Sequence, residues 1–268
     1  MLVNEQNKKY LEILLEPIKL CSGYTPKFGT SNKDGTPLLE FKNLYASDPL
    51  YHWIGFDSDL MYAAHKAAGG ITSVYRQLGI GCERLIRQII SDQLDLNTKQ
   101  VIWGYEIIKN DGSSAKLTLD AKISVDDIKN SRYRDMINEW LKLSSIKLGL
   151  DTNRSKTLVG AAFEIRQGYK SADSKRQNAD LLNAIRAYNE NLLPVMMVLS
   201  CQINATVLKR YKAAQLLVLI GILNDDPTIS SYAFCEQILN YSLEDFFRNN
   251  SSFIKEEINK VLVSLLNP

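Results

Sequence analysis

Hydrophobic and polar positions along the chain follow two different periods, which predicts a mixture of helices and strands. Apolar residues recur at helical spacing from Ser73 to Leu94, and a shorter stretch of the same kind over residues 4–20 predicts a helix broken or kinked near Pro17. Gly69 and Gly70 predict a break before the longer helix. Residues 21–50 collect Gly, Pro and small polar residues, which predicts an irregular arm.

A β-hairpin is expected after the Ser73–Leu94 helix. The runs Val101–Ile108 and Ala115–Ser124 flank Lys109-Asn110-Asp111-Gly112, and Asp-Gly between two apolar runs is a strong hairpin signal. In the second run, apolar residues alternate with polar ones. Asp120 therefore falls on the polar face of the second strand.

A third strand, Leu158–Gln167, follows a helix that begins at Asp126 or Asp127 and ends at Leu148, before Gly149. Glu164 lies opposite the apolar row of this strand, so it also falls on a polar face. Gly168 predicts a bulge or bend directly afterwards.

The remaining elements complete a mixed central β-sheet flanked by helices, an α/β fold. They are a helix from Asp173 or Ser174 to about Asn191 that packs through Ala179, Leu182, Ile185 and Ala187, a strand over Val195–Ser200, a helix and strand within Leu208–Leu223, and helices near Cys235–Asn249 and Ser252–Leu266. We divide the chain into an N-terminal helix and arm over residues 1–70, a core over 71–223 and a helical C-terminal extension of the same domain over 224–268.

Composition narrows the class of protein. The 268 residues are 45% hydrophobic and 23% charged, which excludes a disordered chain. Four isolated cysteines and two histidines support neither a zinc site nor a disulfide framework, and they favour a reducing, cytoplasmic setting. The longest apolar runs are shorter than the roughly 20 residues that a membrane helix needs, so no membrane association is expected.

Asp120 and Glu164 form the first candidate site. If their strands are neighbours, the two carboxylates converge at one place on the sheet, where they can bind a divalent cation such as Mg²⁺ through oxygen. Such a cation can activate water and stabilise charge on a phosphate. Lys170 follows closely, where it can contact the phosphate or help activate the water. By pattern alone the signal for a metal site is weak, because an Asp and a Glu on a solvated sheet face are commonplace.

A basic segment after Glu164 favours nucleic acid. Arg166, Lys170, Lys175 and Arg176 gather before and within a predicted helix N-terminus, where anions are favoured. Arginine and amide side chains are the types that read base edges. The candidate DNA-binding residues are Arg166, Gln167, Lys170, Ser171, Asp173, Lys175, Arg176, Gln177 and Asn178.

The order of these elements and acidic residues resembles the PD-(D/E)xK nuclease core. The stretch EIRQGYKSADSKRQNADLLNA, together with SVYRQLGIGCERLIR and YAFCEQILNYSLEDFFRNNS, is similar to bacterial type II restriction endonucleases over about residues 70–255. The resemblance implies a restriction-endonuclease-like core over 71–223 and Mg²⁺-dependent hydrolysis of double-stranded DNA at a short specific sequence. A palindromic target further implies a homodimer.

Under this resemblance, Asp120 is the first acidic metal ligand, Glu164 the second, and Glu83 an additional acidic candidate. The chain departs from the motif at two positions. Arg166 stands where the motif has Lys, and Leu119 stands where it has Pro. Because arginine is a poor general base, we assign the third catalytic position to Lys170, brought back by the bend at Gly168, with Gln167 as the second candidate.

Two other functions remain open. A nuclease of the same fold could act on DNA structure, as a repair enzyme or junction resolvase does, with the same carboxylates and little sequence preference. A non-catalytic DNA-binding protein would instead carry Asp120 and Glu164 as ordinary surface residues. His52 and His65 are interpreted as structural rather than catalytic.

Overall fold

The computed structural model describes residues 5–28, 34–108, 113–169 and 173–267, and the chain divides into two compact units. The helical unit contains residues 1–81 and 249–268, and the sheet unit contains residues 82–248. All of the candidate site residues belong to the sheet unit. None of the helices in the described ranges is long and apolar enough to cross a membrane.

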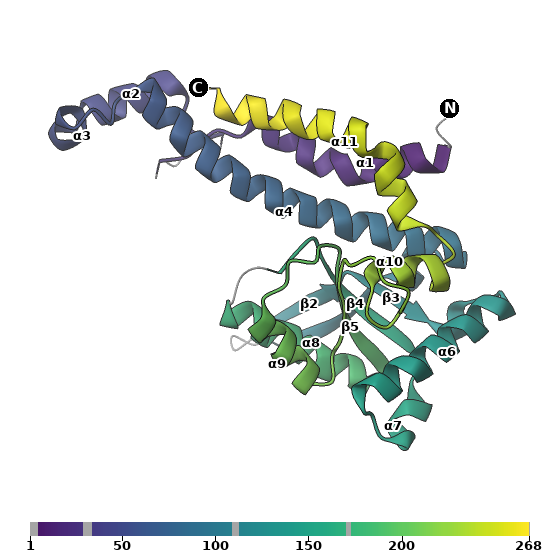
Figure 1. The fold of residues 1–268 in the computed structure, drawn as a ribbon. Helices are drawn as coiled ribbons and strands as arrows, with labels where there is room; N and C mark the ends of the chain where they lie inside the picture. Colours follow the sequence, from purple (N-terminus) through teal and green to yellow (C-terminus); the bar gives the residue numbers. More distant parts are fainter. Residues whose placement is uncertain (1–4, 29–33, 109–112, 170–172, 268) are drawn as a thin grey trace. The chain divides into compact units, whose positions relative to one another are not determined.

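A four-stranded sheet in the order β3-β4-β5-β6 forms the centre of the sheet unit (Figure 1). The strands are β3 (Ala121–Ser124), β4 (Gly160–Arg166), β5 (Leu192–Val198) and β6 (Leu217–Leu219). β3 pairs antiparallel with β4, whereas the β4–β5 and β5–β6 pairs are parallel. The predicted mixed sheet is therefore confirmed, and the parallel pairs join through helices as such pairs must.

The predicted hairpin is confirmed, but its second strand is shorter than expected. β1 (Trp103–Ile108) pairs antiparallel with β2 (Ser114–Leu119), and the turn 109–112 lies outside the described residues. The chain bends at Asp120, and Ala121 then pairs with Phe163 of β4. The single strand predicted over 115–124 thus belongs to two separate sheets, with Asp120 at the crossing point.

Helices cover both faces of the central sheet. On one face, Phe163 of β4 stacks on Trp140 of α6 (Ser131–Leu148), with ring centroids 6.2 Å apart, and also contacts Phe234. On the other face, Met196 of β5 packs in a cluster with Ala184 of α8 (Ser174–Asn189) and Val207 of α9 (Ala205–Ala213). Ala162 of β4 is buried on this second face with Ala187. Because side chains alternate along a strand, Glu164 and Arg166 follow Ala162 onto the α8 face.

Several predicted boundaries need correction. Asn130, rather than Asp126 or Asp127, caps α6, because its side chain accepts from the Arg132 backbone N–H; the two aspartates lie in a short 3-10 turn, Val125–Asp127. The predicted C-terminal end of α6 at Leu148 is confirmed, and Gly149 directly after it adopts the left-handed conformation with φ +64°. Pro194 lies inside β5 rather than before it.

The C-terminal region is more continuously helical than expected, and two short helices form elsewhere that were not predicted. A π-helix, Phe234–Ile238, follows α10 (Ser231–Ala233), and α11 runs unbroken over Leu243–Leu266 where two helices were predicted. Short helices also form at α5 (Thr98–Val101) and α7 (Thr152–Thr157).

In the helical unit, glycines and a proline do not interrupt the helices as predicted. α1 (Glu5–Lys19) includes Pro17 and leads into the 3-10 helix η1 (Leu20–Gly23); the arm contains α2 (Leu38–Ala46) and α3 (Pro49–Trp53). α4 (Asp59–Leu94) runs through Gly69 and Gly70. A Cβ at Gly70 would meet the Leu265 side chain. Because glycine has no Cβ, α4 can pack closely against Leu265 at this position, and the helix is not broken there.

The close approach of β3 and β4 generates a testable prediction at Gly160. A Cβ there would lie 2.1 Å from the backbone oxygen of Ile123, which cannot move without disturbing the strand pair. We expect Gly160→Ala to lower the free energy of unfolding by about 2 kcal/mol or more, as overpacking does. Gly168→Ala is the control, because its nearest new contact is an ordinary 3.6 Å. Urea unfolding measures both, and equal stability of the two variants would contradict the prediction.

Candidate carboxylate site

Asp120 lies where the chain passes from the hairpin to the central sheet, and its side chain is only 13% exposed. β3 begins only at Ala121, opposite Phe163, so it does not extend alongside Ile165 of β4. The backbone N–H of Ile165 donates to Asp120 Oδ2, at 2.7 Å. The strand break thus orients the Asp120 carboxylate across the end of β3 toward β4.

Glu164 and Arg166 lie two residues apart on β4 and project from the same face of the sheet. The Arg166 guanidinium donates to the Glu164 carboxylate, and its Nη1 lies 3.4 Å from Asp120 Oδ2. The structure therefore brings Asp120 and Glu164 together, as expected for neighbouring strands. Arg166, which was expected to contact DNA, lies inside this group with a side chain that is 19% exposed.

Asp180 is a third carboxylate of this group, which the sequence analysis missed. It lies on α8 with 4% of its side chain exposed, and its Oδ1 is 3.7 Å from Arg166 Nη2. Its other oxygen accepts from the hydroxyl groups of Tyr169, at 3.0 Å, and Tyr211, at 2.5 Å. These two buried phenols hold the Asp180 carboxylate in place beside β4.

The pattern on α8 contained the signal for Asp180. The buried residues of this helix are Gln177, Asp180, Ala184, Ala187 and Tyr188, which follow the i, i+3, i+4 spacing of one helical face. The predicted packing face was wrong in three of its four residues: Ala187 is buried, but Ala179 is exposed and Leu182 and Ile185 are 56% and 58% exposed. The packed face is thus marked by Gln177 and Asp180 in line with Ala184 and Ala187. Asp180 is the polar residue of this face that belongs to the site.

Glu83 supplies a fourth carboxylate near the others. It lies on α4 and pairs with Arg87 one turn later, and the Arg87 Nε donates to the backbone oxygen of Asp120. Its negative charge is close enough to raise the pKa of both Asp120 and Glu164. We call Glu83, Asp120, Glu164 and Asp180 the carboxylate cluster.

Negative charge in the carboxylate cluster is only partly compensated. Burial, followed by the charges of Glu164 and Glu83, raises the pKa of Asp120 to about 8. Burial also raises the pKa of Glu164, and Asp180 adds to this effect while Arg166 opposes it. One arginine within the cluster and one at Glu83 leave more acidic than basic groups, so the site favours additional positive charge.

The carboxylate oxygens are the donor type that Mg²⁺ prefers, and two observations bear on whether they fit it. Within the described ranges, no three His, Cys, Asp or Glu side chains lie close enough together to hold one ion. The Arg166 guanidinium contacts three of the four carboxylates, and its Nε is buried without a hydrogen-bond partner. The donor atoms are therefore of the type that a divalent cation takes, but in the described residues they are not gathered around one cation position, and the Arg166 guanidinium lies among them.

The other predicted residues are divided between an exposed surface and buried contacts. Lys175 and Arg176 are exposed in the first turn of α8, where Asp173 caps the helix by accepting from the Lys175 N–H. Gln177 is buried, and Arg210 of α9 donates to Gln177 at 3.0 Å and to Asn178 at 2.6 Å. The structure thus gives Gln177 and Asn178 an intramolecular partner that the sequence analysis did not anticipate.

The proposed third catalytic position is not settled by these contacts. Gln167 is half-buried directly after β4, and the chain bends there, as Gly168 predicted. Lys170 and Ser171 lie outside the described residues. The choice between Lys170 and Gln167 therefore stays a prediction.

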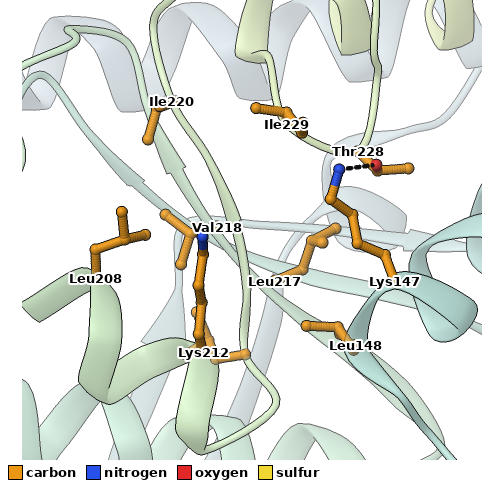
Figure 2. Close-up of a pocket in the computed structure, with 10 residues that line it drawn as sticks. Lys147, Leu148, Leu208, Lys212, Leu217, Val218, Ile220, Thr228 and Ile229 are labelled. Carbon is orange, nitrogen blue, oxygen red and sulfur yellow. Dashed lines mark hydrogen bonds between the residues drawn. The ribbon is translucent and has the colours of Figure 1, made fainter.

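A separate pocket of about 260 Å³ lies at the β6 edge of the sheet (Figure 2). Its lining is mostly apolar, with Lys147 and Lys212 as its charged residues, and Lys147 donates to Thr228 at 2.9 Å. None of the members of the carboxylate cluster lines this pocket. The two sites thus draw on different residues of the same unit.

Comparison with models of known families, with curated proteins and with solved structures found no match to this chain. The nuclease resemblance in the sequence therefore stays a hypothesis, which the geometry of the carboxylate cluster has to support by itself.

The pKa of Asp120 generates a prediction about stability. The folded carboxyl holds its proton up to about pH 8, whereas the unfolded one loses it near pH 3.8, so unfolding releases a proton between these values. Stability from this group is therefore lost progressively as pH rises from about 4 to 8. We expect Asp120→Asn, which removes the buried charge, to raise the free energy of unfolding by about 1–2 kcal/mol at pH 8.5 and by much less at pH 4.5.

Urea unfolding at these two pH values measures the effect. Asp135→Asn on the exposed surface of α6 is the matched control, and it should change stability equally little at both. A destabilised Asp120→Asn protein at pH 8.5 would show that the Asp120 charge is well compensated.

Proposed function

We propose that the chain is a Mg²⁺-dependent endonuclease that hydrolyses double-stranded DNA at a short specific sequence, as a type II restriction endonuclease. One observation carries the proposal: Asp120 and Glu164, assigned from sequence, lie together against Arg166 on one face of the sheet, and buried Asp180 joins them. A solvated pair of surface carboxylates would have been well exposed. The order of β3, β4, α8 and β5 around this cluster supports a restriction-endonuclease-like core.

The residues of the cluster have distinct roles in this proposal. Asp120, between β2 and β3, and Glu164 of β4 would hold the metal, and Asp180 would approach it from α8. Bound Mg²⁺ would polarise the phosphate and lower the pKa of a water molecule. The Ile165 N–H and the two tyrosine hydroxyls keep Asp120 and Asp180 in fixed orientations, so little reorganisation is needed during reaction.

DNA would be held from the same end of α8. Lys175 and Arg176 are exposed at the helix N-terminus, which favours phosphate, and the carboxylates begin one turn later at Asp180. The described residues contain one such carboxylate cluster, so cutting both strands of a symmetric site calls for a second copy of the chain. We therefore propose a homodimer.

Cleavage of DNA tests the proposed reaction. The protein is incubated with several long unmethylated DNAs in Mg²⁺ or EDTA, and fragments are resolved on a gel. We expect discrete Mg²⁺-dependent bands, and we expect Asp120→Asn and Glu164→Gln to slow cleavage by about 100-fold or more, because each removes a metal ligand. Glu139→Gln, which neutralises an exposed carboxylate on α6, should cut at the wild-type rate.

Each alternative has its own outcome in that experiment. A Mg²⁺-dependent smear lost in the same variants would favour a structure-selective nuclease. Binding without cleavage in wild type and variants alike would favour a non-catalytic DNA-binding protein.

Binding of DNA tests the role of the α8 N-terminus separately. We expect Lys175→Ala and Arg176→Ala each to weaken duplex binding by about 3–10-fold and to reduce the salt dependence by about one phosphate contact. Fluorescence anisotropy in EDTA, at several salt concentrations, measures both quantities. Lys142→Ala, on the exposed side of α6, is the control; an equal effect there would show that binding depends only on net charge.

A further inference from the structure

Arg166 makes an unusual set of contacts for a residue at a proposed metal site. Its guanidinium donates to Glu164, and it lies 3.4 Å from Asp120 Oδ2 and 3.7 Å from Asp180 Oδ1. These are three of the four members of the carboxylate cluster. A single protein cation therefore contacts carboxylates from β4, from α8 and from the crossing point before β3.

The shape of arginine explains how one side chain reaches all three carboxylates. The planar guanidinium presents its donors in a fork, whereas the ammonium group of lysine is a compact point charge. Both Nη atoms of Arg166 contact acidic oxygens. In the present arrangement the fork thus lies among the oxygens of Asp120, Glu164 and Asp180.

This arrangement leaves groups unsatisfied on both partners. The Nε of Arg166 is buried without an acceptor, and an unpaired buried donor is unfavourable. Three carboxylates, those of Asp120, Glu164 and Asp180, share the single positive charge of Arg166. A divalent ion would supply twice the charge to the same oxygens.

We propose that Arg166 is an internal counter-ion that occupies the cation position of the carboxylate cluster and must leave it for a divalent metal to bind. This inference rests on the proposed function, because the metal is the one that the nuclease reaction needs. Once released, the guanidinium is available to a phosphate, the anion whose geometry it matches best. Arg166 is thus a positioning residue that couples the two ligands.

The coupling has a defined direction. In the free protein, part of the metal-binding free energy is spent in displacing Arg166, so the affinity for metal is reduced. A DNA phosphate that binds the released guanidinium lowers this cost, and by linkage the metal raises the affinity for DNA equally. The free protein would therefore bind metal weakly until duplex DNA is present.

Metal binding to the full chain without DNA tests the inference directly. Mn²⁺ is the probe, and its free concentration is followed by electron paramagnetic resonance at pH 7.5. We expect Arg166→Gln, which keeps a polar side chain but removes the charge, to bind Mn²⁺ at least tenfold more tightly than wild type. Arg132→Gln, at an exposed position on α6, should match wild type.

A second variant covers the case in which Arg166→Gln does not fold. Arg166→Lys keeps the positive charge but loses the fork, so it should bind Mn²⁺ about threefold more tightly than wild type. Circular dichroism establishes which variants are folded. Unchanged or weaker Mn²⁺ binding by the folded variants would overturn the inference.

The outcomes separate this inference from the proposed function. DNA cleavage by the wild type, together with Arg166 variants that bind Mn²⁺ no better, would overturn the counter-ion role and leave the nuclease standing. Absence of both Mn²⁺ binding and cleavage in every folded variant would overturn both.

Discussion

Pairing of β4 on both sides is the constraint on which the sheet unit depends. Its backbone is hydrogen-bonded to β3 on one side and to β5 on the other, so its side chains can project only toward the helices above and below. Phe163 enters the aromatic core under α6, and Glu164 and Arg166 enter the interface with α8. Two ionisable side chains are thus carried into a largely buried layer by the pleat of a central strand.

That placement determines the electrostatics of the site. Charged groups in a buried layer need partners, because isolated buried charges are strongly disfavoured. The three carboxylates of the layer share the Arg166 guanidinium. Asp120 also accepts from the Ile165 backbone N–H, and Asp180 accepts from the hydroxyl groups of Tyr169 and Tyr211. These contacts orient the oxygens.

Local patterns in the sequence were enough to predict most of the sheet. Alternation predicted Leu119, Ala121 and Ile123 as apolar core positions, and all three are buried; Asp-Gly predicted the β1–β2 hairpin. The break at Asp120 was not predictable in this way, since the alternation continues unchanged while the pairing partner changes from β1 to β4. Strand partners depend on contacts distant in sequence, which a local pattern does not contain.

The site was predicted in part for the same reason. Asp120 and Glu164 stand out as acidic residues within apolar strands, whereas Asp180 looks like one more polar residue on a polar helix. Leu182 and Ile185 misdirected the assignment of the packed face, because their size suggested burial; the tertiary fold buries Ala184 beside the correctly predicted Ala187 and leaves both large side chains exposed. The helix start at Asp173 was predicted correctly, because capping is a local interaction.

Helix α8 joins two kinds of side chain on one rigid rod. Its first turn exposes Lys175 and Arg176, and the next turn presents Asp180 to β4, about 6 Å further along the axis at 1.5 Å per residue. Because both turns belong to one continuous helix, the backbone of α8 fixes the distance between the exposed basic side chains and the buried carboxylate.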